Sequence, residues 1–169
     1  LETALLLFAK PKGFSKSKLI EKYPRIKEIP FDATTKMMGT LHELKNGKYM
    51  VCIKGALEVI LQESDMVMTD NGEKNTVNFN FWENHNNQLA AKGERTLAFA
   101  YSIIDLPEEN FFHNLNFIGC ISFLDPPRPD IKAAIQTCQD AGIKVIMATG
   151  DHPETAKNIA HQVGLAEQK

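Results

Sequence analysis

Residue types suited to phosphate chemistry gather at Thr149-Gly150-Asp151, directly after the apolar run of residues 143–148. That run has the composition of a strand buried on both faces of a parallel sheet. Pro153 and Glu154 follow it, as they would in the first turn of a helix. Because a helix N-terminus at the carboxyl end of such a strand attracts phosphate, these residues could support phosphoryl chemistry. A plain strand-to-helix turn with a capping Thr or Asp explains the same residues, and both interpretations stay open.

The elements that must position these residues can be read from apolar spacing and turn residues. Asn46-Gly47 lies between two apolar runs and predicts a β-hairpin. The spacing of apolar residues predicts helices at 2–10, 15–23, 55–62, 77–92, 130–141 and 153–163. It predicts strands at 25–31, 37–44, 48–54, 95–104, 116–124 and 143–148. Residues 64–76 are polar, and Asp70-Asn71-Gly72 within them is expected to form a turn.

The arrangement of these elements changes at about residue 115. Before it, hairpins and helices indicate an antiparallel α+β domain at residues 1–115. After it, strand, helix, strand and helix indicate a βαβα unit of a parallel sheet at residues 116–169. One such unit leaves sheet edges uncovered, so its remaining strands are expected to come from further sequence.

Composition narrows the class of protein. The 169 residues carry a net charge of −2, which gives no reason to expect a nucleic-acid partner. Three widely spaced cysteines argue against a disulfide framework or a zinc site. No apolar run approaches the length of a membrane span, and the first residues lack the basic start of a signal peptide. Since the sequence begins without Met and in a helical pattern, we expect an excised fragment.

Common catalytic signatures are missing from the sequence. It has neither a G-x-x-x-x-G-K-[ST] loop nor a G-x-G-x-x-G turn. It has no G-x-S-x-G elbow, and its five histidines are scattered rather than spaced as metal ligands.

A series of segments nevertheless matches one family in order. The segments are E-T-A-L at 2–5, P-F-D-A-T-T-K-M at 30–37, K-G-A-L-E at 54–58, G-E-R-T-L-A at 93–98, D-P-P-R at 125–128 and M-A-T-G-D-H-P-E-T-A at 147–156. Together they resemble the cytoplasmic nucleotide-binding domain and the adjoining phosphorylation-domain segment of a P-type cation-transporting ATPase. The H-P-x-T-A continuation is most similar to calcium, sodium/potassium and related pumps. The resemblance implies an α/β (α+β) fold: an antiparallel sheet with flanking helices, then a βαβα segment of a haloacid-dehalogenase-like Rossmannoid domain.

The resemblance also implies an adenine-nucleotide site. Phe31 would stack on the adenine, Glu2 would meet its amine, and Gly55 would allow a close backbone approach. The full set implied for nucleotide binding is Glu2, Phe31, Lys36, Lys54, Gly55, Arg95, Asp125 and Arg128. On the residues alone, Phe31 also fits core packing, and the charged residues fit solvated strand ends, a first-turn helix acid and surface ion pairs.

The family motif at residues 149–151 implies a second role. Thr149, Gly150 and Asp151 would support the transferred phosphoryl group, so these three are the candidate catalytic residues. The cofactors implied are ATP and, through ligands outside this sequence, Mg²⁺. The partners implied are the remaining pump domains, which are the membrane, actuator and remaining phosphorylation segments, and the location implied is the cytoplasmic side of an integral membrane protein.

The sequence departs from the family pattern at several points. Leu57 replaces the usual proline, and Ala33 replaces a basic residue, so one phosphate contact is expected to be lost. The D-K-T-G-T motif with the phosphorylated aspartate and the G-D-G-x-N-D magnesium segment are both absent, so the chain alone is not expected to hydrolyse ATP or move an ion. Two alternatives remain: a soluble haloacid-dehalogenase-like phosphohydrolase, although no D-x-D motif occurs, or a non-catalytic protein-interaction domain.

Overall fold

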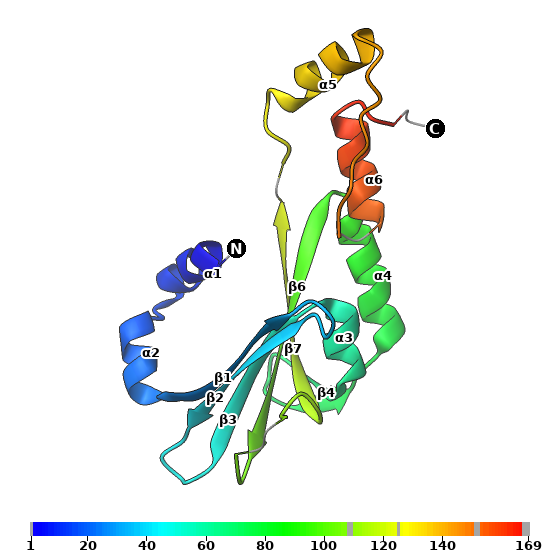
Figure 1. Cartoon of the computed structure of the whole chain (residues 1–169). Coiled ribbons are helices and arrows are strands. Elements are labelled where there is room, and N and C mark those ends of the chain that lie inside the picture. Colours follow the sequence, from blue (N-terminus) through cyan, green and yellow to red (C-terminus); the bar gives the residue numbers. More distant parts are fainter. Residues whose placement is uncertain (1, 108–109, 125, 151–152, 167–169) are drawn as a thin grey trace. The chain divides into compact units, whose positions relative to one another are not determined.

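A computed structural model describes residues 2–107, 110–124, 126–150 and 153–166. The chain forms two compact units, one made of residues 1–77 and 99–119 and the other of residues 78–98 and 120–169. Figure 1 labels most of the elements, which are numbered in chain order. The elements are α1 (Glu2–Ala9), η1 (Lys10–Lys12), α2 (Lys16–Lys22), β1 (Arg25–Asp32), β2 (Met37–Glu43), β3 (Tyr49–Gly55), α3 (Leu57–Gln62), β4 (Ser64–Met68), β5 (Lys74–Thr76), α4 (Phe79–Ala90), β6 (Glu94–Ile104), β7 (Leu115–Leu124), α5 (Ile131–Asp140) and α6 (Pro153–Gln162).

A seven-stranded sheet in the order β1-β2-β3-β6-β7-β4-β5 organises the described chain. The β1–β2, β2–β3 and β4–β5 pairs are antiparallel, and β4 runs parallel to β7. The mixed α/β fold expected from the sequence is therefore confirmed. Strands β6 and β7 each have residues in both compact units.

The predicted hairpin is present between β2 and β3. Gly47 adopts a φ of 77°, and the Lys48 amide donates to the Asn46 side chain at 3.2 Å. The ladder pairs Met37 with Gly55 and Glu43 with Tyr49 without a break. This register fixes which side chains share a face of the sheet.

The core of the first unit covers one face of this hairpin. Leu41, Val51 and Ile53 point into it and are almost fully buried. Helix α3 packs beside β3 and β4 and buries Leu57, Ile60 and Leu61. Alternation along the strands then places the side chains of the neighbouring positions, including Met38 and Lys54, on the opposite and less covered face.

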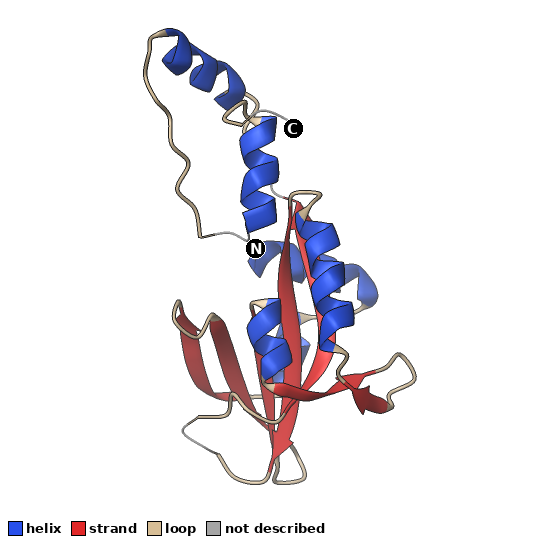
Figure 2. Ribbon diagram, turned by 90° about the vertical axis from the view of Figure 1, so that its right-hand side faces the viewer, coloured by secondary structure: helices blue, strands red, loops and turns tan. Residues whose placement is uncertain are grey.

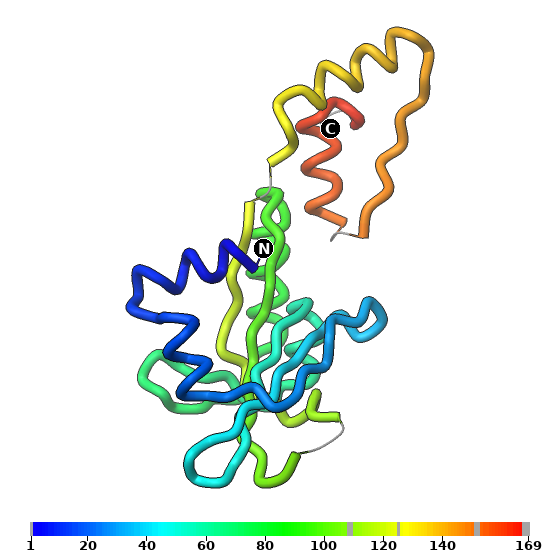
Figure 3. The backbone as a smooth tube through the Cα atoms, turned by 60° about the vertical axis from the view of Figure 1, so that its left-hand side comes forward, coloured from blue at the N-terminus to red at the C-terminus, as the bar shows by residue number. Residues whose placement is uncertain are grey.

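The N-terminal helices lie outside this core. Neither α1 nor α2 contains a buried residue. Figure 3 follows the chain from α1 through α2 into β1. Gly13, with a φ of 83°, allows the turn between the two helices.

The second unit has helices α4, α5 and α6 as its main elements. Helix α6 packs on α4, and the Asn158 side chain donates to the Ala91 carbonyl at 2.7 Å. The buried Thr155 hydroxyl donates to the Glu94 carbonyl at 3.2 Å. These two bonds fix α6 to the turn between α4 and β6.

One sequence expectation about an element was incomplete, and another was wrong. The turn expected at Asp70-Asn71-Gly72 is present, with Gly72 at a φ of 83°, but the strands β4 and β5 that it joins into a hairpin were not predicted. Residues 143–148 form no strand and are drawn as a loop in Figure 2. Ile146 is 77% exposed there. A parallel strand needs hydrogen-bonded neighbours, and the described chain supplies none at this segment.

Candidate functional site

A capped turn between β1 and β2 sets the position of Lys36. The Asp32 carboxylate accepts hydrogen bonds from the backbone amides of Thr34 and Thr35, at 2.7 Å and 3.0 Å. These bonds hold the pKa of Asp32 below its usual value, because they favour the charged form. The Lys36 amide donates to the Asp32 carbonyl at 2.8 Å and closes the turn.

Gly55 lets this turn approach the end of β3. Lys36 has a φ of 53°, and its carbonyl accepts a hydrogen bond from the Ala56 amide at 3.1 Å. A Cβ at Gly55 would lie 2.5 Å from the Lys36 carbonyl oxygen and 2.9 Å from Cγ of Met37. Glycine is therefore required for the contact, which brings the backbones of Lys36 and Lys54 to the same end of the sheet.

Lys54 lies on β3 directly opposite Met38 of β2. Its side chain is 18% exposed and forms an ion pair with the Glu2 carboxylate in the first turn of α1. The Lys36 ammonium pairs with Glu58 at 3.0 Å. Each of the two predicted lysines thus holds a carboxylate partner.

Phe31 occupies a bulged position on the edge strand β1. The β1–β2 register shifts between Ile29 and Asp32. Proline has no amide proton to donate, and Pro30 is tolerated there because a bulge on an edge strand does not need that donor. Since Asp32 pairs with Met37, alternation places Phe31 on the face that carries Met38 and Lys54. Phe31 is 62% exposed, so core packing does not account for this residue.

The first unit therefore brings five predicted residues to one end of the sheet: Glu2, Phe31, Lys36, Lys54 and Gly55. An exposed aromatic ring can stack on a flat base, and two ammonium groups can pair with phosphates. Two residues of this region were not among the predicted site residues, Asp32 and Glu58. The Asp-x-Thr-Thr sequence is a signal for the capped turn, whereas the pairing of Glu58 with a residue 22 positions away has no local signal.

The remaining predicted residues lie in the second unit. Arg95 is an exposed residue of β6, and Arg128 pairs with Asp130 at 3.6 Å just before α5. Thr149 and Gly150 are exposed in the segment that precedes α6. Asp125 and Asp151 lie outside the described residues.

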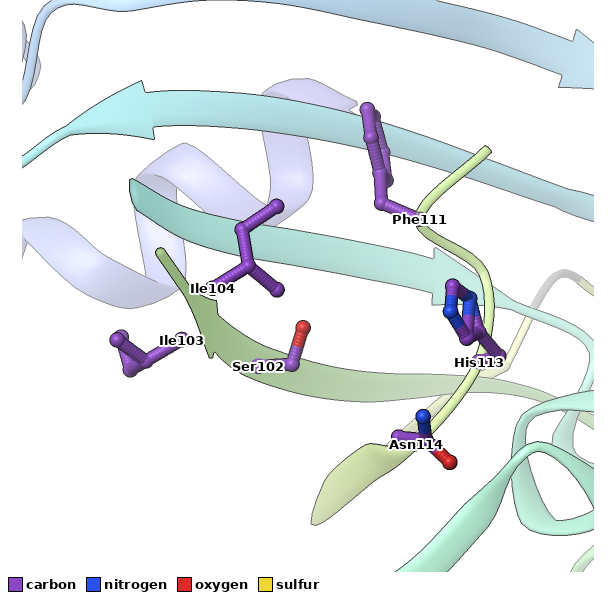
Figure 4. Close-up of a pocket in the computed structure, with 6 residues that line it drawn as sticks. All are labelled: Ser102, Ile103, Ile104, Phe111, His113 and Asn114. Carbon is purple, nitrogen blue, oxygen red and sulfur yellow. The ribbon is translucent and has the colours of Figure 1, made fainter. Parts of the chain in front are cut away.

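A small cavity occurs elsewhere in the first unit. It measures about 170 Å³ and is lined by residues of β6 and of the segment before β7 (Figure 4), which are Ser102, Ile103, Ile104, Phe111, His113 and Asn114. None of the predicted site residues lines it. Phe31 and Lys54 of the predicted nucleotide residues instead lie on the less covered face of the sheet.

Among the residues with described positions, no three His, Cys, Asp or Glu side chains are grouped closely enough to hold a metal ion. None of the helices in the described ranges is both long and apolar enough to cross a membrane.

The family model and the relatives that match this chain all describe one class of protein, the P-type ATPases. Residues 1–130 match the family model described as P-type ATPase, cytoplasmic domain N. The chain is 38% identical to a calcium-transporting ATPase of Bacillus subtilis, over 97% of its own length and 19% of that protein. It is 38% identical to the human sodium/potassium-transporting ATPase subunit alpha-4, over 99% of its length and 18% of that subunit. A cation-transporting ATPase of Synechocystis is 36% identical over 99% of the chain, which spans 19% of that relative.

Proposed function

Because this chain belongs to the P-type cation-transporting ATPases, we propose that it is the ATP-binding part of such a pump. It spans less than a fifth of the length of the relatives it matches, so the activity of the whole protein is part of the proposal. In the intact pump it would present ATP to an aspartate outside this sequence, and phosphorylation of that aspartate would drive cation transport. The observation that carries the proposal is the grouping of exposed Phe31 with Lys36 and Lys54 at one end of the sheet.

Different residues of the first unit would contact the adenine and the phosphates of the nucleotide. Phe31 would offer its ring to the adenine, and Glu2 would accept a hydrogen bond from the adenine amine. Lys36 and Lys54 would face the phosphates as mobile point charges. Bound ATP would supply the γ-phosphoryl group for transfer. In the second unit, Arg95, Asp125 and Arg128 are proposed as further nucleotide contacts, and Thr149, Gly150 and Asp151 as supports of the transferred group.

The proposal includes the division of the chain. Residues 1–115 would form the nucleotide-binding domain, and residues 116–169 part of the phosphorylation domain. The partners would be the membrane, actuator and remaining phosphorylation segments of the pump, with this domain on the cytoplasmic side. Mg²⁺ would act in the intact protein through residues outside this sequence. Exposed Ile143 and Ile146 support the proposal that further strands complete the second domain.

Nucleotide titration of the isotope-labelled chain tests the proposal. ATP and a non-hydrolysable analogue should shift the backbone amides of Phe31, Lys36 and Lys54 at about 1 mM, where a binding free energy of about −4 kcal/mol gives half saturation. The shifts should depend little on Mg²⁺. No change at these amides at several times that concentration would refute the proposal.

A pair of lysine variants provides the matched control. Lys54→Ala should weaken ATP binding, whereas Lys48→Ala should not. Lys48 is an exposed lysine of the first unit, and like Lys54 it holds a carboxylate partner, Asp105, at 2.9 Å. Equal losses in the two variants would indicate that only general positive charge attracts the nucleotide.

A further inference from the structure

Both lysines at the proposed site are neutralised by carboxylates of the same chain. Lys54 pairs with Glu2, which the proposed function already assigns to the adenine amine. Lys36 pairs with Glu58, 3.0 Å away, which has no assigned role. A phosphate chain that approaches Lys36 would therefore compete with the Glu58 carboxylate for the same ammonium group.

The backbone holds this second pair in place. Lys36 is fixed by the capped turn and by the bond from the Ala56 amide to its carbonyl. Glu58 lies in the first turn of α3, a helix anchored by buried Leu57 and Ile60. Because both backbones are fixed, the two side chains can meet, separate and meet again without a change in the fold.

The charges at Lys36 favour replacement of the Glu58 carboxylate by a phosphate group. Both partners of the pair are about half exposed, so water and salt screen their attraction. A di- or triphosphate brings several negative charges and many acceptor oxygens to the same ammonium group. The carboxylate can thus be displaced, but its displacement reduces the net gain from binding.

We propose that Glu58 is an intramolecular competitor of the nucleotide phosphates at Lys36 and thereby sets the affinity of the site. This inference rests on the proposed function of the same site. It identifies Glu58 as an affinity-determining residue for polyphosphate ligands, independent of the base.

The test compares Glu58→Gln with Asp105→Asn in the full chain. Each substitution removes one negative charge from an exposed lysine–carboxylate pair of the first unit, at 3.0 Å and 2.9 Å respectively. Glu58→Gln should tighten binding of ATP and of inorganic tripolyphosphate about two- to fivefold, or about 0.4–1 kcal/mol, and leave adenosine binding unchanged. Asp105→Asn should leave all three unchanged.

Two further conditions isolate the mechanism. The gain from Glu58→Gln should disappear in a Lys36→Gln background, because no ammonium group is then released. It should also shrink at about 1 M salt, where the screening length is about 3 Å.

The outcomes separate this inference from the proposed function. Absence of ATP binding by the parent chain would overturn both. ATP binding by the parent, together with equal effects of Glu58→Gln and Asp105→Asn, would overturn this inference alone. Weaker ATP binding by Glu58→Gln would also overturn it, since Glu58 would then assist the ligand.

Discussion

Replacement of Phe31 by alanine tests whether the exposed ring serves a ligand or the fold. Phe31 is 62% exposed, so its buried part contributes on the order of 1 kcal/mol to folding, against roughly 1.5–3 kcal/mol for a fully buried side chain. If the ring stacks on adenine, its loss should cost about 1–3 kcal/mol of binding free energy. We therefore expect a Kd raised about five- to 150-fold and a Tm lowered by only about 2–4 °C.

Two other phenylalanines serve as controls for the Phe31 variant. Phe111 is 1% exposed, and Phe111→Ala should cost about 3–5 kcal/mol of unfolding free energy. Phe14 is exposed like Phe31 but lies between the two N-terminal helices, so Phe14→Ala should change neither stability nor affinity appreciably. Thermal melting and calorimetric titration with ATP on all three variants give both quantities.

The result that would refute this reasoning is a Phe31→Ala chain that melts as early as Phe111→Ala. The ring would then belong to the core despite its exposure. Unchanged ATP affinity in a folded Phe31→Ala variant would refute the stacking role instead. Because stability and affinity are measured on the same sample, loss of fold cannot be mistaken for loss of a contact.

Three further predictions follow from the turn and the cysteines. Gly55→Ala should lower the free energy of unfolding by about 1–3 kcal/mol and shift the Lys36 amide, since the added Cβ would meet the Lys36 carbonyl oxygen; an unperturbed amide in the NMR spectrum would contradict this. The pKa of Asp32 should lie below its ordinary value of 3.8, because backbone amides stabilise its carboxylate. The stability that this contributes to the fold is present above the unfolded pKa and is lost as pH falls through the folded pKa. A midpoint at or above 3.8 in carboxyl NMR would exclude the cap. Burial raises the pKa of the Cys52 and Cys120 thiols, so alkylation at pH 8 should be slower in the folded chain than in urea, and equal rates would contradict the burial.

Local signals predicted much of the fold. Asn46-Gly47 determines a two-strand register that extends from Met37 to Glu43 without interruption. Apolar spacing correctly indicated α5 and α6, whose inward residues include buried Ile135 and Thr155. Such signals suffice where an element is stabilised by its own sequence and one apolar face.

Elements that depend on distant partners were harder to predict. The short strand β5 has no buried residue, so its sequence carries no alternating pattern, and it forms through pairing with β4. Residues 143–148 show the opposite case, because their composition suits a buried strand but the described chain provides no neighbour for it. In both cases the pairing partner decides the structure.

The site shows the same division between local and distant determinants. The sequence identified Phe31, Lys36 and Lys54 through family motifs, but not that the ring is exposed or that carboxylates occupy the lysines. The two ion pairs join residues 52 and 22 positions apart, and no local pattern encodes such distances. Asp32 could have been identified from its neighbouring threonines, since carboxylates commonly cap the amides two and three residues on.

The backbone and the side chains of this site have different tasks. Hydrogen bonds at Asp32 and the missing Cβ of Gly55 fix the positions from which both lysines extend, so little ordering of the backbone is needed when a ligand binds. The lysine charges, in contrast, are held by carboxylates in exposed or partly exposed pairs that cost little to separate. For the proposed nucleotide, a site built in this way would favour rapid exchange over tight retention. Ala33, where the family that the sequence resembles usually has a basic residue, would shift the balance in the same direction, because it would leave the proposed phosphates one cation fewer.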